Sequence, residues 1–158
     1  MNMLLKIKKL CSKIYALGLI EPDYFRKRSL SELATIYNGA GPDWMSTISR
    51  SVLTFLLRFF ATAFLIHDVE FHENKNRLDT PENRAEFHRA NKRMWKNIKI
   101  LVAANFAWYN PRRWYWRTKG WLAYRACQKW GWSAWIAVGS EQNQVVMQAK
   151  KISIGRNG

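Results

Sequence analysis

The residues with the clearest potential for chemistry are a histidine and an aspartate that are adjacent in the sequence, His67 and Asp68. Imidazole is the side chain best suited to accept a proton near neutral pH, and carboxylate oxygens are ligands for hard cations such as calcium. Upstream, residues 37–43 read YNGAGPD, and the glycines allow the backbone to turn several carbonyl oxygens toward one point. These groups predict a site where an oxygen-liganded cation lies beside a general base.

A helical repeat of apolar residues positions His67 and Asp68 on different faces of one helix. The repeat follows the spacing i, i+3, i+4, i+7 and i+11, and its members are Phe60, Ala63, Phe64, His67 and Phe71. It predicts a helix that ends near Glu73, with His67 directed inward. Asp68 is rotated by roughly 100° about the helix axis, onto the flank shared with Ala61 and Leu65.

A second long helix is predicted to follow the polar connection of residues 74–79. Its start, residues 80–82, combines a capping threonine, a proline at the first helical position and an early acid. The pattern continues to about Ala107. Its apolar face also carries asparagines and consists of Asn91, Met94, Ile98, Leu101 and Asn105. We therefore expect Asn91 to point toward the core.

Shorter signals define the elements before the site. Apolar residues at helical spacing within residues 4–17 predict an amphipathic helix that ends near Gly18. This helix either packs on the domain or lies on a membrane. Ser29 and Glu32 form a capping-box pattern, which predicts a short helix toward Ile36.

Capping and breaking residues set the remaining helix bounds. Ser46 or Thr47 can cap the helix that carries His67, so this helix is expected to run from there to about Glu73. Asn110 and Pro111 end the second long helix, and a last helix is predicted to reach about Val138, with a kink at Gly131. The fold class is therefore all-α. Residues 1–138 are expected to form a single helical domain, and residues 139–158 a polar tail that is disordered or contributes one edge strand.

The charge of the chain is strongly positive and unevenly distributed. The 158 residues contain 26 Lys and Arg against 11 Asp and Glu, a formal charge of +15. Residues 87–140 contain no Asp or Glu but hold eight of the nine tryptophans. Interleaved cations and indoles suit an anionic membrane surface or a nucleic acid. The structural alternative is that the tryptophans fill the core beneath a solvated basic face.

The remaining composition bears on location. Cys11 and Cys127 are too few to staple an extracellular domain, which favours a cytoplasmic or virion-associated protein. Lysines interrupt every apolar run near the N-terminus, so we predict no signal peptide. The longest apolar stretch, residues 51–66, includes Arg58 and is shorter than a bilayer crossing needs. We predict peripheral membrane contact and no transmembrane helix.

The order of these motifs resembles the phospholipase A2 superfamily, and more closely the phospholipase A2-like proteins of phages and bacteria. The resemblance covers residues 37–135: a Y-x-G-x-G loop at Tyr37, then a helix with His67 and Asp68, then a second long helix. It implies an all-α fold in which two long antiparallel helices carry the site, with additional N-terminal and C-terminal helices. It also implies calcium-dependent hydrolysis of the phospholipid sn-2 ester at an anionic membrane.

The resemblance also implies individual roles. The backbone carbonyls of Tyr37, Gly39 and Gly41 and the carboxylate of Asp68 would hold Ca²⁺. His67 would be the general base that activates water, and the amide of Gly39 would stabilise the oxyanion. A residue of the second helix orients the imidazole. The family has aspartate there, and this chain has Asn91.

Departures from the family pattern keep a second hypothesis open. Asn91 is neutral, and Phe71 stands where the family often has tyrosine. The alternative is a non-catalytic phage structural or accessory protein that uses the cationic, tryptophan-rich segment to bind membrane, nucleic acid or a virion partner. Taken singly, His67 also fits a core histidine and Asp68 a partner for an arginine such as Arg84. His72 and His88 are expected at the surface.

Overall fold

The computed structural model describes residues 2–37, 57–74 and 79–136, and within them all regular structure is helical. The elements are α1 (Met3–Ala16), α2 (Leu30–Ile36), the 3-10 turn η1 (Arg58–Phe60), α4 (Ala61–Asn74), α5 (Pro81–Asn105) and α6 (Pro111–Ile136). The all-α class and the five helices predicted in these ranges are confirmed. The glycine loop, the first part of the helix expected from Ser46 or Thr47 to Glu73 and the tail at 139–158 lie outside the described residues. Within the described part of that predicted helix, Leu57 is in a turn and residues 58–60 form η1, so α4 begins only at Ala61.

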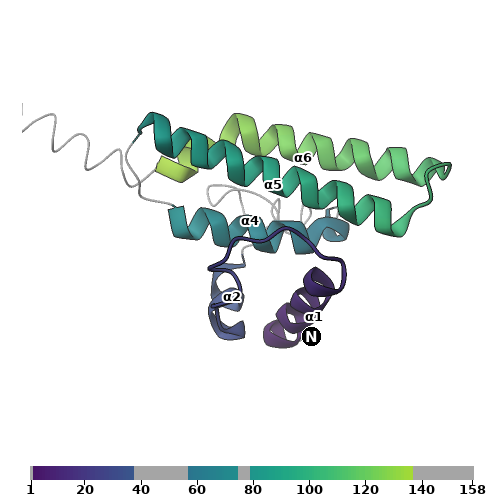
Figure 1. Ribbon diagram of the computed structural model, residues 1–158, viewed down its shortest axis with the longest axis horizontal. Helices are drawn as coiled ribbons and strands as arrows, with labels where there is room; N and C mark the ends of the chain where they lie inside the picture. Colours follow the sequence, from purple (N-terminus) through teal and green to yellow (C-terminus); the bar gives the residue numbers. More distant parts are fainter. Residues whose placement is uncertain (1, 38–56, 75–78, 137–158) are drawn as a thin grey trace, which may run out of the picture.

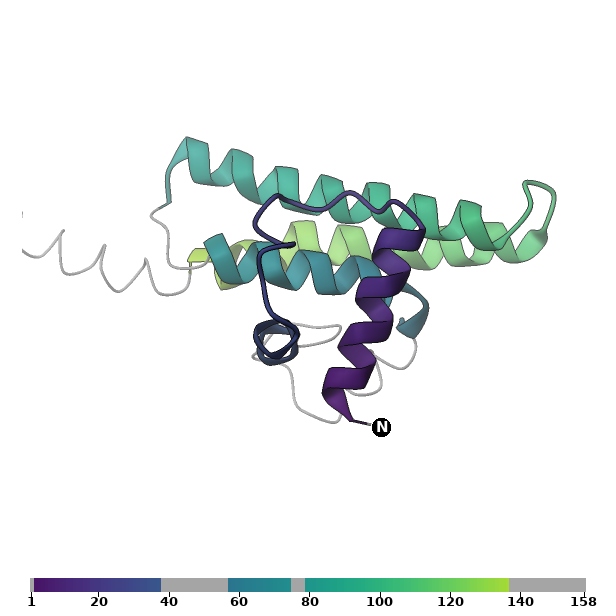
Figure 2. The same ribbon diagram turned by 60° about the horizontal axis from the view of Figure 1, so that its bottom comes forward.

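The helices are arranged around α4. Figure 1 shows α5 and α6 as a long antiparallel hairpin on one side of α4, with α1 and α2 on the opposite side. Figure 2 shows that α1 crosses the direction of α4 steeply. Because α4 is covered on both sides, most of its residues from Thr62 to Glu70 are buried, and His67 is among them. In the described ranges, no helix is long and apolar enough to cross a membrane.

The N-terminal helix α1 ends at Ala16, two residues before Gly18, near which the sequence predicted its end. Gly18 has φ +58°, a conformation that glycine adopts without strain, and the amide of Leu19 donates to the carbonyl of Ile14 at 3.0 Å. The chain then runs along α5, where the side chain of Asn97 both accepts from the amide of Ile20 (2.8 Å) and donates to its carbonyl (2.7 Å). This paired contact fixes the segment after α1 against α5.

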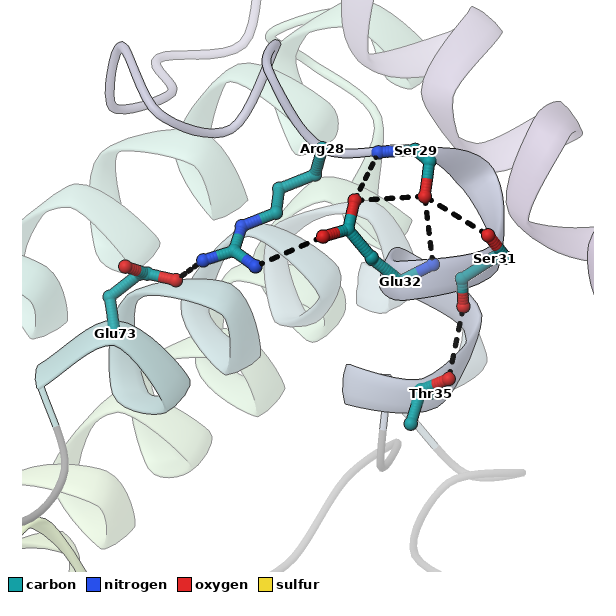
Figure 3. A network of polar contacts seen from close by, with 6 residues as sticks. All are labelled: Arg28, Ser29, Ser31, Glu32, Thr35 and Glu73. Atoms are coloured by element: carbon teal, nitrogen blue, oxygen red, sulfur yellow. Dashed lines mark hydrogen bonds and ion pairs between the residues drawn. The ribbon is translucent and has the colours of Figure 1, made fainter.

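The predicted capping box starts α2 and is tied to α4. The hydroxyl of Ser29 accepts from the amide of Glu32 (3.2 Å), and the carboxylate of Glu32 accepts from the amide of Ser29 (2.7 Å). Figure 3 shows Arg28 reaching from this cap to both Glu32 and Glu73, the latter near the end of α4. Arg28 therefore links the start of α2 to α4.

The hairpin of α5 and α6 depends on two glycines. A Cβ at Gly120 would collide with Cγ2 of the buried Ile98 and lie 3.2 Å from Cζ of Phe60. A Cβ at Gly131 would lie 3.2 Å from Phe87 and 3.3 Å from Phe71. Gly131, where a kink is predicted, lies within the bounds of α6. The glycines thus permit close approach of α6 to its neighbours.

Candidate functional site

The structure brings His67 of α4 and Asn91 of α5 together in the core. Nε2 of His67 lies 3.0 Å from Oδ1 of Asn91. The Nδ2 group of Asn91 donates to the carbonyl of Phe87 at 2.9 Å, which orients the amide so that its oxygen faces the ring. The imidazole therefore donates from Nε2, and its lone pair is on Nδ1. The helical spacing predicted that both side chains point inward, and the resemblance implied that Asn91 orients the imidazole.

His67 lies in an apolar environment that keeps it neutral. Its side chain is 6 % exposed, and the ring centroid of Phe71 lies 4.4 Å away. Burial lowers the pKa of His67 to about 4, because desolvation disfavours the imidazolium more than the hydrogen bond to Asn91 favours it. Neutral imidazole can accept a proton, but a base with this pKa is weak. A negative partner in place of Asn91 would strengthen it.

Phe71 connects His67 to an aromatic cluster between the ends of α4, α5 and α6. Its ring meets Trp135 edge to face at 4.7 Å, and Phe87 lies 5.5 Å from Trp135. Trp135 and Phe87 are almost fully buried. Phe71 therefore contributes only ring contacts to this cluster.

Asp68 lies on the neighbouring face of α4, as its helical position predicts, and is half-buried. Burial, with the negative charge of Asp68 as the second cause, raises the pKa of Tyr37 to about 12. The same two causes raise the pKa of Cys127 of α6 to about 12. Asp68 is therefore within electrostatic range of the end of α2 and of α6. The group affected in Tyr37 is the phenol, whereas the calcium ligand predicted from this residue is its backbone carbonyl.

The donor set in this region is consistent with an oxygen-liganded calcium ion only if the backbone supplies most of the oxygens. Gly39 and Gly41, from which two carbonyls are expected, lie outside the described residues. Within the described ranges, no cluster of three or more His, Cys, Asp and Glu side chains forms. Asp68 is the one charged ligand in the predicted set, so the fit depends on carbonyl oxygens such as that of Tyr37.

A second polar pair between α4 and α5 was not anticipated. Glu70 is 4 % exposed, and its carboxylate lies 2.8 Å from Nη1 of Arg93. Burial raises the pKa of Glu70 to about 7, although the charge of Arg93 acts in the opposite direction. The side chain of Asn74 donates to the carbonyl of Glu70 at 2.8 Å. Glu70 is three residues after His67, so the same helical spacing could have identified it as inward-facing.

The other expectations for charged and aromatic residues are met in part. Nη2 of Arg84 donates to the two carboxylate oxygens of Asp79, at 3.0 and 3.2 Å. His72 and His88 are exposed as predicted.

The tryptophans between residues 108 and 135 divide between the surface and the interior. Four are exposed, namely Trp108, Trp114, Trp121 and Trp130. Three are wholly or partly buried, namely Trp116, Trp132 and Trp135. Both the core and the surface interpretations therefore hold for some of them.

The described site thus comprises a neutral histidine oriented by an asparagine and, on the adjacent helical face, a carboxylate near Tyr37. Comparisons of the whole chain add no relative to this geometry: no protein-family model, curated protein or solved structure matches it.

Proposed function

We propose that this protein is a phospholipase A2-like enzyme that hydrolyses the sn-2 ester of membrane phospholipids in a calcium-dependent reaction. The observation that carries the proposal is the 3.0 Å contact from Nε2 of His67 to Oδ1 of Asn91. It supports the proposal because it leaves the lone pair on Nδ1, where a general base needs it.

In the proposed reaction, His67 takes a proton at Nδ1 from the water that attacks the ester carbonyl. Asn91 holds the ring through Nε2 and prevents the other tautomer. The amide of Gly39 donates to the developing oxyanion. Because Asn91 carries no charge, it stabilises the imidazolium less than a carboxylate does, and we expect slow turnover.

The proposed calcium ion is held by the carboxylate of Asp68 and by the backbone carbonyls of Tyr37, Gly39 and Gly41. When bound, calcium polarises the ester carbonyl and binds the lipid phosphate. With one carboxylate in the site, the expected dissociation constant is on the order of 10⁻⁴ to 10⁻³ M. Asp68 also adjoins His67 in the chain, so the carboxylate and the imidazole project from neighbouring faces of α4.

The proposal is tested by fatty-acid release from vesicles of phosphatidylglycerol, measured with calcium and with a chelator. The variants are His67→Gln, which removes the base, and His88→Gln, which changes an exposed histidine of α5 and serves as the matched control. We expect calcium-dependent release for the parent and for His88→Gln, and background for His67→Gln. Release at the same background level in every sample would rule out hydrolysis.

A second candidate function is favoured by the exposed tryptophans of the hairpin. Trp108 and Trp114 are 78 % and 67 % exposed, beside a segment without carboxylates. Such surfaces commonly mark interaction sites. The protein would then be a non-catalytic structural or accessory protein that binds a membrane, a nucleic acid or a virion partner. Binding with no measurable hydrolysis would favour this function over the first.

A further inference from the structure

A cleft of about 440 Å³ lies between the second half of α5 and the first turns of α6. Figure 1 shows these two segments side by side, near the connection that joins the helices. Four cationic side chains line the cleft: Lys96, Lys99, Arg113 and Arg117. Its volume falls in the range of small-molecule sites, and the proposed hydrolysis uses none of these residues.

Among the described residues that line the cleft, none is an Asp or Glu. The sequence from residue 87 to residue 140, which includes all of the helical lining, contains no Asp or Glu. Ile20 also lines the cleft, and its neighbour Glu21 is engaged with Arg26. Nη1 of Arg113 donates to the carbonyl of Phe106 at 3.3 Å, which uses one of the five guanidinium donors. Four like charges around one opening favour an anionic ligand.

The rest of the lining is apolar. Ile100, Val102 and Ala103 of α5 contribute to the cleft, and Ile20 forms another part of it. Ile20 is held there because its backbone makes two hydrogen bonds to the side chain of Asn97. A ligand that satisfies both parts of the surface has an anionic group and an aliphatic portion. Phospholipids have this combination, whereas a nucleic acid offers no aliphatic chain to the apolar part.

Exposed aromatic residues lie on the same side of α6 as the cleft. Trp114, Arg117, Trp121 and Arg125 follow the spacing i, i+3, i+7 and i+11, so they share one face of the helix. Arg117 belongs both to this face and to the cleft. Trp114 and Trp121 are 67 % and 46 % exposed, and indole rings with cations between them suit the headgroup region of a bilayer.

We propose that the cleft between α5 and α6 binds the phosphate headgroup of an anionic phospholipid and docks the protein on a membrane surface. Lys96, Lys99, Arg113 and Arg117 are the anion-binding residues, and the Trp114–Trp121 face rests at the interface. This inference goes beyond hydrolysis and does not require His67 to be catalytic. His67 and Asn91 lie in the core on the α4 side of α5, and the cationic cleft faces outward.

The test is co-sedimentation with vesicles of equimolar phosphatidylcholine and phosphatidylglycerol, compared with vesicles of phosphatidylcholine alone. All measurements are made on the full chain in the His67→Gln background, so that lipid is not consumed and a failure of hydrolysis does not affect the result. We expect binding to the anionic vesicles only. Comparable binding to both compositions, or to neither, overturns the proposal.

The cleft is tested by the double variant Arg113→Gln and Arg117→Gln, with Lys96→Gln and Lys99→Gln as a second pair. The matched control is Lys8→Gln with Lys9→Gln, which removes the same charge from the exposed face of α1. Removing two cations at the contact should weaken partitioning by roughly 30-fold. The control should bind nearly as the parent does, and circular dichroism confirms that each variant is folded.

An equal loss in the control would show that net charge alone drives binding and would overturn the cleft proposal. Trp114→Ser with Trp121→Ser is expected to weaken binding even at high salt, because the indole contribution is not electrostatic. Parallel titrations with duplex DNA give the remaining outcome. Binding to DNA that is lost in the cleft variants, together with no binding to anionic vesicles, would assign the surface to nucleic acid and refute the lipid site.

Discussion

The side-chain amide of Asn91 presents its oxygen to Nε2 of His67 at 3.0 Å while its nitrogen donates to the carbonyl of Phe87 at 2.9 Å. Both hydrogen bonds are buried, so a reversed amide would place two donors or two acceptors against each other. Asn91 is thus held in one orientation, and it holds the imidazole in one tautomer. The properties of His67 are determined by this neutral partner and by burial.

Replacing Asn91 with aspartate is expected to raise the pKa of His67 from about 4 toward neutrality, because a carboxylate stabilises the imidazolium. If hydrolysis occurs, its rate should rise by roughly tenfold or more. The variant should also lose about 1–3 kcal/mol of stability, since its second oxygen would face the carbonyl of Phe87 without a hydrogen to donate. Histidine proton shifts followed by NMR report the pKa, and an unchanged value would contradict the assigned contact.

Acid sensitivity provides a test of the buried histidine. The pKa of His67 is about 4 in the folded protein and 6.5 when exposed, so its contribution to stability is fully present above pH 6.5 and is lost as the pH falls toward 4. His67→Gln should flatten the dependence of the unfolding free energy on pH in this window. Urea unfolding at several pH values measures how the unfolding free energy depends on pH. His88→Gln is the control, and an identical slope in parent and His67→Gln would refute the burial effect.

Arg93→Met tests the ion pair with Glu70. Burial raises the pKa of Glu70 from 4.5 to about 7, so the favourable contribution of the protonated form is present below pH 4.5 and is lost as the pH rises through 7. Without Arg93, the carboxylate of Glu70 has lost its charged partner. We expect the free energy of unfolding to fall by about 3 kcal/mol above pH 7, and by less near pH 4.5, where Glu70 is protonated. The control is Arg89→Met, because Arg89 pairs with Glu86 at the surface. Equal losses for the two variants would contradict the difference in burial.

Gly120→Ala is expected to destabilise the hairpin. In an exposed helix, alanine is more favourable than glycine by about 1 kcal/mol. At Gly120, the added methyl group collides with Ile98, which is fully buried and cannot move away, so we expect a net loss of about 1–3 kcal/mol. Gly131→Ala should lower the stability less, because the added Cβ would lie 3.2 Å from Phe87 and 3.3 Å from Phe71 and would not collide with them. Thermal unfolding compares them, and a more stable Gly120→Ala protein would contradict the close approach.

The sequence alone determined the local structure, because helix starts, helix ends and inward faces depend on residues within a few positions of one another. The capping box of Ser29 and Glu32, the end of α1 near Gly18 and the inward direction of His67 and Asn91 all follow from such short-range rules. The end of α5 was predicted two residues late, at Ala107 instead of Asn105. Helix ends depend on weak local differences between neighbouring residues.

Only the tertiary structure decided which side chains meet across helices. The contact of Glu70 with Arg93, the shift in the pKa of His67 and the convergence of Lys99 with Arg113 depend on how α4, α5 and α6 are placed. Helical periodicity gives the direction of each side chain about its own axis, but it does not give the distance or rotation between helices. The distance and rotation between helices are set where helices approach closely, as at Gly120. The missing side chain of Gly120 affects packing only because Ile98 of the neighbouring helix lies against it.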